Sequence, residues 1–195
     1  MGKRILWGTL VGSLVVFVVS SIWHMASGLG EVGIQNLPNE DAVLSAMHSS
    51  VSKPGLYFFP GMTPPAGRSS EQRRADQTAY LAKFKAGPNG ILIYHPDGEE
   101  LNFGKLLTIQ FLVGLAASFL LCWILAATIE ATTYWKRISM VVAITLFAGI
   151  IFDIPYWNWY GFPTNYTLVH MAGWVVSWGI AGLAMAAIVR RPAHT

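Results

Sequence analysis

Long apolar runs dominate this chain and are separated by one extended polar stretch. Three runs, over residues 5–26, 106–129 and 168–189, carry no formal charge, and each is near the roughly 20 residues that a helix needs to cross a bilayer. A fourth run, 138–152, is shorter, and it reaches across only if Tyr134 and Trp135 extend it while the neighbouring basic side chains snorkel to the interface. The pattern predicts four transmembrane helices.

The polar stretch, residues 28–104, is rich in Pro and Gly and carries signals of local structure. Helices are expected over 40–49, with Asn39 as N-cap, and over 71–85, with Ser69 or Ser70 as N-cap. Strands are expected over residues 56–59, 91–94 and 101–103, the last two forming a hairpin around a Pro-Asp-Gly turn. The predicted fold class is an all-α membrane bundle of four transmembrane helices with a small α+β extracytoplasmic domain inserted between helices 1 and 2.

This pattern divides the chain into three segments. Residues 1–27 form an uncleaved signal-anchor helix, 28–104 the cap, and 105–195 the other three helices with an interfacial aromatic loop and a cytoplasmic tail. The cap is small and has no disulfide to stabilise it, because the chain holds one cysteine. Its helices are expected to bury two apolar faces, made by Val43, Leu44 and Met47 and by Tyr80, Leu81 and Phe84.

Composition and charge narrow the class of protein. Hydrophobic residues make up 53% of the chain and charged residues 12%, against about 25% charged in soluble domains, which excludes the large soluble enzyme folds. Three basic pairs flank apolar runs: Lys3–Arg4, Lys136–Arg137 and Arg190–Arg191. Such pairs are topology signals, and they place both termini in the cytoplasm and residues 28–104 outside a bacterial-type inner membrane. No basic face with interleaved aromatics indicates nucleic-acid binding.

Ionisable residues at the ends of apolar runs are the first candidates for chemistry, because such groups are costly in a membrane. His24, Asp153 and His170 lie near the same side in the predicted topology. Two histidines on different helices could ligate haem b, and the carboxylate would complete a copper or zinc site. The alternatives are that all three are polar residues of the interface without a ligand, or that they take part in proton or quinone chemistry.

The connection 153–166 is rich in aromatic residues and contains Pro155 and Pro163. We expect the prolines to keep it from continuing as helix and the rings to form an interfacial belt. The sharper alternative is an aromatic-walled pocket for a lipid tail or a quinone, with Trp157, Trp159 and Tyr160 as binding residues beside Asp153 and His170.

Small residues recur at helical spacing in the first and last runs, at Gly8 and Gly12 and at Gly173, Ser177, Ala181, Gly182 and Ala186. Such stripes let helices approach closely, within this bundle or with another subunit. No nucleophile–base pattern or phosphate-binding loop is present, so no catalytic residue is assigned. The chain is therefore expected to be a non-enzymatic accessory or assembly subunit that binds the bilayer and other membrane subunits, with a haem or metal redox protein and a lipid or quinone binder as alternatives.

Overall fold

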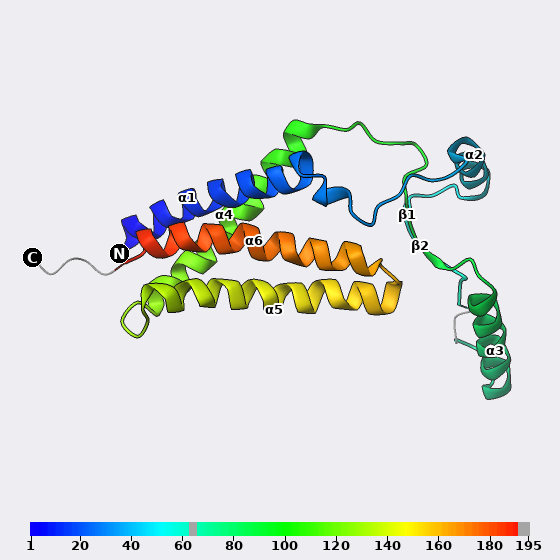
Figure 1. Cartoon of the computed structure of the whole chain (residues 1–195). Helices are drawn as coiled ribbons and strands as arrows, with labels where there is room; N and C mark the ends of the chain where they lie inside the picture. Colours follow the sequence, from blue (N-terminus) through cyan, green and yellow to red (C-terminus); the bar gives the residue numbers. More distant parts are fainter. Residues whose placement is uncertain (63–65, 191–195) are drawn as a thin grey trace, which may run out of the picture. The chain divides into compact units, whose positions relative to one another are not determined.

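The computed structural model describes residues 1–62 and 66–190, and Arg191 therefore lies outside the described residues. Within the described residues, four helices are long and apolar enough to cross a membrane, which confirms that part of the predicted fold class. They are α1 (Gly2–Ser21), continued by the π-helix η1 (Ile22–Ala26), α4 (Phe103–Ala127), α5 (Tyr134–Tyr160) and α6 (Thr164–Ile188) (Figure 1).

The third membrane-length helix extends further than expected from the sequence. α5 continues through Pro155 to Tyr160, so the prediction that the prolines end the helix near Asp153 is wrong for Pro155. A proline near the end of an apolar helix is tolerated when neighbouring groups satisfy the freed carbonyl. The helix ends instead at Gly161, whose φ of 72° lies in the left-handed region that glycine adopts without strain.

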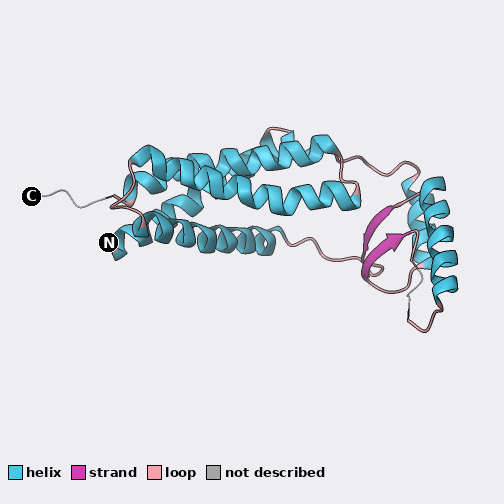
Figure 2. Ribbon diagram, turned by 90° about the horizontal axis from the view of Figure 1, so that it is seen from below, coloured by secondary structure: helices cyan, strands magenta, loops and turns pink. Residues whose placement is uncertain are grey.

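Small residues determine how the helices pack. α6 lies between α1 and α5, and α1 also packs against α4, whereas α4 and α5 have almost no contact (Figures 1 and 2). A Cβ on Gly12 would lie 2.7 Å from Cγ of Met185, and one on Gly173 would lie 2.8 Å from Nε1 of Trp23. The small-residue stripes therefore pack inside this bundle, the first of the two possibilities left open by the sequence.

The bundle's packed core lies toward the end where α1 begins and α6 ends, which we call the terminus end. Cys122, Val141 and Met185 are fully buried there. The Arg4 side chain donates to the carbonyl of Arg190, and the Arg137 side chain donates to that of Val189. Arginines thus donate to the carbonyls that immediately follow α6, as cations do near helix C-termini. We call the opposite end, where α5 meets α6, the Gly161 end.

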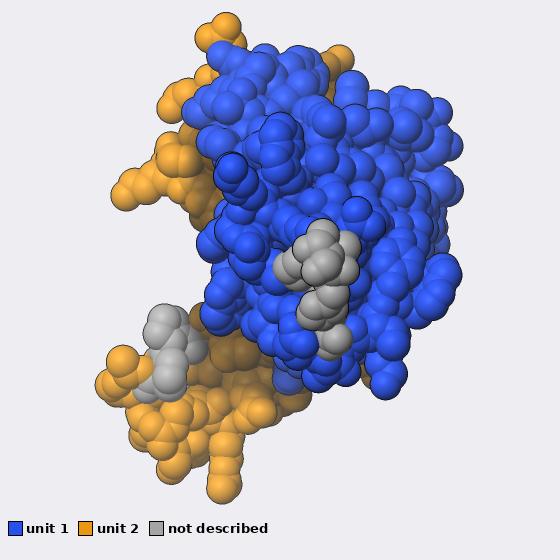
Figure 3. Space-filling model, turned by 90° about the vertical axis from the view of Figure 1, so that its left-hand side faces the viewer, with its two compact units in different colours: residues 1–35, 101–195 blue, residues 36–100 orange. Residues whose placement is uncertain are grey.

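Residues Asn36–Glu100 form a second compact unit (Figure 3). It contains α2 (Glu40–Ser50), β1 (Gly55–Phe59), α3 (Ser70–Ala86) and β2 (Gly90–Tyr94). β1 pairs antiparallel with β2, Leu56 opposite Ile93. The predicted hairpin of residues 91–94 with 101–103 is therefore wrong: β2 takes the apolar β1 as its partner, and Phe103 begins α4. Part of the connection before α3, residues 63–65, lies outside the described residues.

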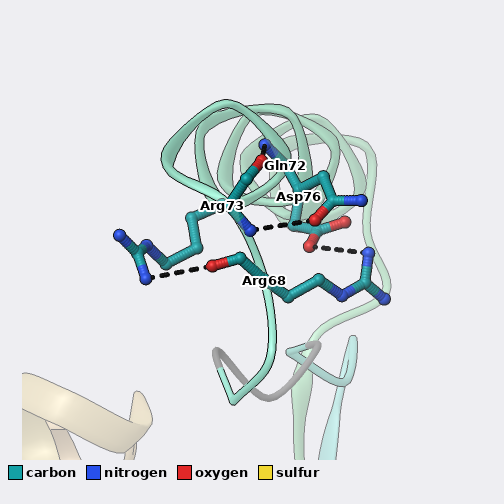
Figure 4. Close-up of polar contacts among 5 residues, drawn as sticks. Arg68, Gln72, Arg73 and Asp76 are labelled. Atoms are coloured by element: carbon teal, nitrogen blue, oxygen red, sulfur yellow. Dashed lines mark hydrogen bonds and ion pairs between the residues drawn. The ribbon is translucent and has the colours of Figure 1, made fainter.

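The helices of this second unit are stabilised locally. Ser69 and Gln72 form a capping box at the start of α3, Arg68 and Asp76 form an ion pair of 3.3 Å, and Arg73 donates to the Arg68 carbonyl (Figure 4). Asn39 precedes α2 as expected, but its side chain makes no capping hydrogen bond.

The apolar faces expected to be buried in this unit are only partly buried: Val43, Met47 and Tyr80 are half-buried. Neither α2 nor α3 has a buried residue, and Leu44, Leu81 and Phe84 are exposed. The physical reason is that α2, α3 and the sheet make few contacts with one another. The unit therefore gains little from hydrophobic burial.

Candidate functional site

An acid–imidazole pair joins α5 to α6. Nδ1 of His170 lies 2.9 Å from Oδ1 of Asp153, and the two side chains are 26% and 15% exposed. When the carboxylate is ionised it can only accept hydrogen bonds, and Nδ1 then carries the hydrogen and donates it. The second ring nitrogen, Nε2, is thereby left to accept from another group when the ring is neutral, or to donate when it is protonated.

Aromatic rings hold the imidazole in place. Tyr166, His170, Trp174 and Trp178 follow one another at every fourth position of α6 and so share one face of the helix. The Tyr166 ring stacks on the His170 ring at 5.6 Å and 10°, and the Trp174 ring meets it edge-on at 5.5 Å and 83°. Trp174 and Trp178 are not among the site residues predicted from the sequence, although their spacing of four residues along the helix from His170 is a signal that could have found them.

A cavity of about 630 Å³ lies between α4, α5 and α6, within the roughly 300–1,000 Å³ of small-molecule sites. It exists because α4 and α5 diverge. Its walls are lined by Val113, Ala117, Leu120, Leu121, Ile124, Ile144, Thr145, Ala148, Gly149, Phe152, Asp153, His170, Trp174 and Trp178. The Thr145 hydroxyl already donates to the Val141 carbonyl, so the Asp153–His170 pair is the main polar feature of an otherwise apolar wall.

The cavity is elongated along the helices. On α4 its lining runs from Val113 to Ile124, which at 1.5 Å per residue is about 16 Å, or about half of a 30 Å hydrocarbon core. Val113, Leu120 and Phe152 are more than half exposed, so the cavity opens sideways between α4 and α5. The shape suits one hydrocarbon chain with its polar head at the Gly161 end.

His24, the other predicted histidine, lies on the π-helix η1, where the wider turn is marked by the bond from Ser27 N to the Ile22 carbonyl. Its side chain is exposed. The short 3₁₀ helix η2 (Leu29–Glu31) folds back on it, and a Cβ on Gly30 would lie 2.7 Å from Cα of His24. Glycine at this position permits the close approach of the two segments.

His24 and His170 border two common spaces. The smaller, which we call the recess, has a volume of about 10 Å³, and the larger, the vestibule, about 210 Å³. Both volumes are below the size of ordinary small-molecule sites. Among residues 1–62 and 66–190, no three His, Cys, Asp or Glu side chains form a group that could hold a metal ion. The haem and metal sites stay predictions from the sequence.

The three aromatic residues predicted to bind a lipid or quinone lie elsewhere. Trp157 donates from Nε1 to the Thr164 hydroxyl at 3.0 Å. Trp159 is 78% exposed, and the Tyr160 ring lies 5.5 Å from that of Tyr156. None of the three borders the cavity, because α5 continues as helix and carries them past its end.

A second apolar groove, of about 580 Å³, lies between α1 and α4. It is lined by Gly2, Ile5, Leu6, Thr9, Leu112, Leu115, Ala116 and Phe119. None of these side chains is ionisable, so the groove offers a lipid chain no charged or titratable partner. It serves below as the control surface for the cavity.

Comparisons of the chain with protein-family models, with curated protein sequences and with solved structures gave no match. The function is therefore argued from the chemistry of the site.

Proposed function

We propose that this protein binds a long-chain lipophile inside the membrane, with the chain in the cavity and a neutral hydrogen-bonding head at His170. The observation that carries the proposal is the position of the Asp153–His170 pair in the wall of an elongated apolar cavity. An ionisable pair in an apolar helix bundle is costly unless it has a partner or a function.

The charge of the pair favours a neutral head. With Asp153 ionised, the pair carries no net charge when the imidazole is protonated and one negative charge when it is neutral. An anionic headgroup would therefore meet repulsion or no attraction, whereas a hydroxyl or carbonyl can hydrogen-bond to Nε2 of His170. The indole rings of Trp174 and Trp178 add flat surfaces on which a ring-shaped head can stack. A quinone or quinol fits these conditions best among membrane lipophiles.

The test is chemical analysis of lipid that copurifies with the full-length protein in mild detergent. We expect organic extraction and mass spectrometry to find one lipophile class enriched over the bulk membrane in a near-stoichiometric amount. Finding a quinone supports the proposal as stated. Finding a diacylglycerol or a long-chain alcohol supports the binding site but assigns the bound lipophile a different headgroup. Phospholipid in bulk proportions would overturn the proposal.

Matched variants locate the bound lipophile. Ala117→Phe places a ring in the cavity, and Ala116→Phe, one residue away, places the same ring in the α1–α4 groove. The enriched lipophile should be lost from the first variant and kept in the second. His170→Ala, which keeps the cavity but removes the hydrogen-bonding ring, should lower the retained amount. Loss from both phenylalanine variants would show that the lipid binds the general apolar surface.

The same proposal includes a topology. The first residues of α1 and α5 and the last of α6 bring Arg4, Arg137 and Arg190 to the terminus end. By the positive-inside rule this end is cytoplasmic, and residues 28–104 are extracytoplasmic. A cysteine placed at Tyr80 should react with an impermeant thiol reagent in intact cells, and one at Lys136 should react only after the membrane is opened. The reverse pattern would overturn the sidedness.

A second candidate function is an accessory or assembly subunit of a larger membrane complex. The observation that favours it is the second unit, where Leu81 and Phe84 on α3 and Leu56 on β1 are exposed. A partner subunit would bury this apolar surface. Cross-linking in cells followed by mild extraction should capture a reproducible partner through residues 36–100, and Leu81→Glu should weaken it. Extraction as a lone chain under conditions that preserve other complexes would count against this candidate.

A further inference from the structure

His170 borders three spaces. The residue is part of the lining of the apolar cavity, of the recess and of the vestibule. The vestibule is enclosed by η1, η2, the segment after η2 and α6, and Leu29, Val32 and Val169 are among its walls. The imidazole therefore separates a hydrocarbon-lined space from one that begins at the exposed His24.

The recess between these spaces has the properties of a water site. Its volume of about 10 Å³ matches one water molecule, which needs roughly 10–15 Å³. Ser177 borders it, is 1% exposed, and its hydroxyl has no hydrogen-bond partner among the described residues. A buried hydroxyl without a partner costs about 1–3 kcal/mol, and a water shared with the two imidazoles would remove that cost.

We propose that the vestibule and the recess form a hydrated proton path, which leads from the Gly161 end of the protein through His24 and Ser177 to Nε2 of His170. Along it, a proton moves between water and Nε2 before this nitrogen bonds the lipophile head, and only the N–H bond at Nε2 is made or broken. The inference rests on the proposed function for the ligand, but not for the path. A protonated His170 donates to a carbonyl head, and a neutral His170 accepts from a hydroxyl head.

The groups that face His170 are consistent with this role. Asp153 contacts it from α5, His24 shares two spaces with it from η1, and Tyr166 stacks on it from its own helix. The residues of α4 that line the cavity carry no titratable side chain. Among the described residues, the vestibule therefore offers water the polar side chains of His24 and Tyr166, whereas the cavity-lining part of α4 offers it no titratable group.

The path is tested by modifying His170 with diethylpyrocarbonate, a water-borne histidine reagent, and following it by mass spectrometry of the full-length protein. Val169→Trp fills the vestibule, whereas Leu168→Trp places the same ring on a neighbouring, 60% exposed position outside it. We expect Val169→Trp to slow modification of His170 at least about tenfold, as loss of water access does for buried nucleophiles, and Leu168→Trp to leave it unchanged. Equal rates in both variants would overturn the path.

The cavity variant separates this inference from the proposed function. Ala117→Phe should abolish lipophile retention without slowing the modification of His170. If Ala117→Phe slows the modification and Val169→Trp does not, water enters through the cavity and the path is wrong, whatever the ligand. If no lipophile is found but Val169→Trp still protects His170, the path stands and the proposed ligand falls.

Two buried serines give an independent measurement. Ser177 and Ser118 are both almost fully buried, and neither hydroxyl has a hydrogen-bond partner among the described residues, but Ser177 borders the recess. In a Cys122→Ala background, Ser177→Cys should react with a small water-soluble thiol reagent at least about tenfold faster than Ser118→Cys, because only a hydrated thiol ionises readily. Equal protection of both cysteines would overturn the proposed water site.

Discussion

The two ends of the bundle use the same four helices differently. At the terminus end, small residues bring α1, α4 and α6 together around Met185, which is fully buried. Toward the Gly161 end, α4 and α5 separate and leave a cavity of about 630 Å³ with Asp153 and His170 in its wall. In a membrane, where burial from lipid gains little, close packing is what stabilises a bundle. The packed end therefore provides stability, and the open end provides the site.

The largest expected difference between the two ends comes from truncating a side chain. Met185→Ala should lower the free energy of unfolding by about 2–5 kcal/mol, since it leaves a hole in a close-packed region. Leu120→Ala, at a 57% exposed position of the cavity wall, should change it by less than about 1 kcal/mol. Unfolding of both variants in mixed micelles measures the difference. Similar losses would show that the cavity end also contributes to stability.

Adding a ring should show the same difference in tolerance between the two ends. Ala181 is fully buried, so Ala181→Phe should overpack the bundle and cost about 1–3 kcal/mol or more. Ala117→Phe fills space that exists already and should leave the thermal midpoint of unfolding within a few degrees of the wild type. Thermal unfolding of detergent-purified protein compares the two. A strongly destabilised Ala117→Phe variant would contradict an open cavity.

Two glycines allow the packing of the two regions to be compared by adding one methyl group to each. A Cβ on Gly12 would lie 2.7 Å from Met185, whereas one on Gly114 has no heavy atom within 4 Å. We expect Gly12→Ala to destabilise the bundle by about 1 kcal/mol or more, and Gly114→Ala to be neutral or slightly stabilising because alanine favours helix. The same unfolding assay applies. Equal effects of the two substitutions would mean that α1 does not pack closely against Met185 of α6.

A small effect on stability is expected at the site itself. Asp153→Asn keeps the shape of the side chain and replaces a charged acceptor with a neutral one, so it should cost about 1 kcal/mol or less in unfolding free energy. It should nevertheless lower lipophile retention, because the fixed orientation of the His170 ring depends on the carboxylate. The ratio of retained lipophile to protein is the measurement. A variant that loses stability but keeps the ligand would assign the pair a structural role.

The sequence by itself determined the number of membrane-length helices, because runs of apolar residues are dictated by bilayer thickness wherever the helices later pack. It also located helix starts in the second unit, such as Ser69, since N-caps act within one turn. Asp153 and His170 were both recognised as candidates, because ionisable groups stand out in apolar surroundings.

The tertiary structure alone decided which of those residues and segments contact one another. That Asp153 meets His170, that β1 pairs with β2 and that α4 diverges from α5 are contacts between segments far apart in the chain. The continuation of α5 through Pro155 likewise depends on the surroundings of the helix. Local propensity and periodicity indicate which face of a helix is apolar. Where each helix is apolar on all sides, they do not indicate which face packs against which neighbouring helix.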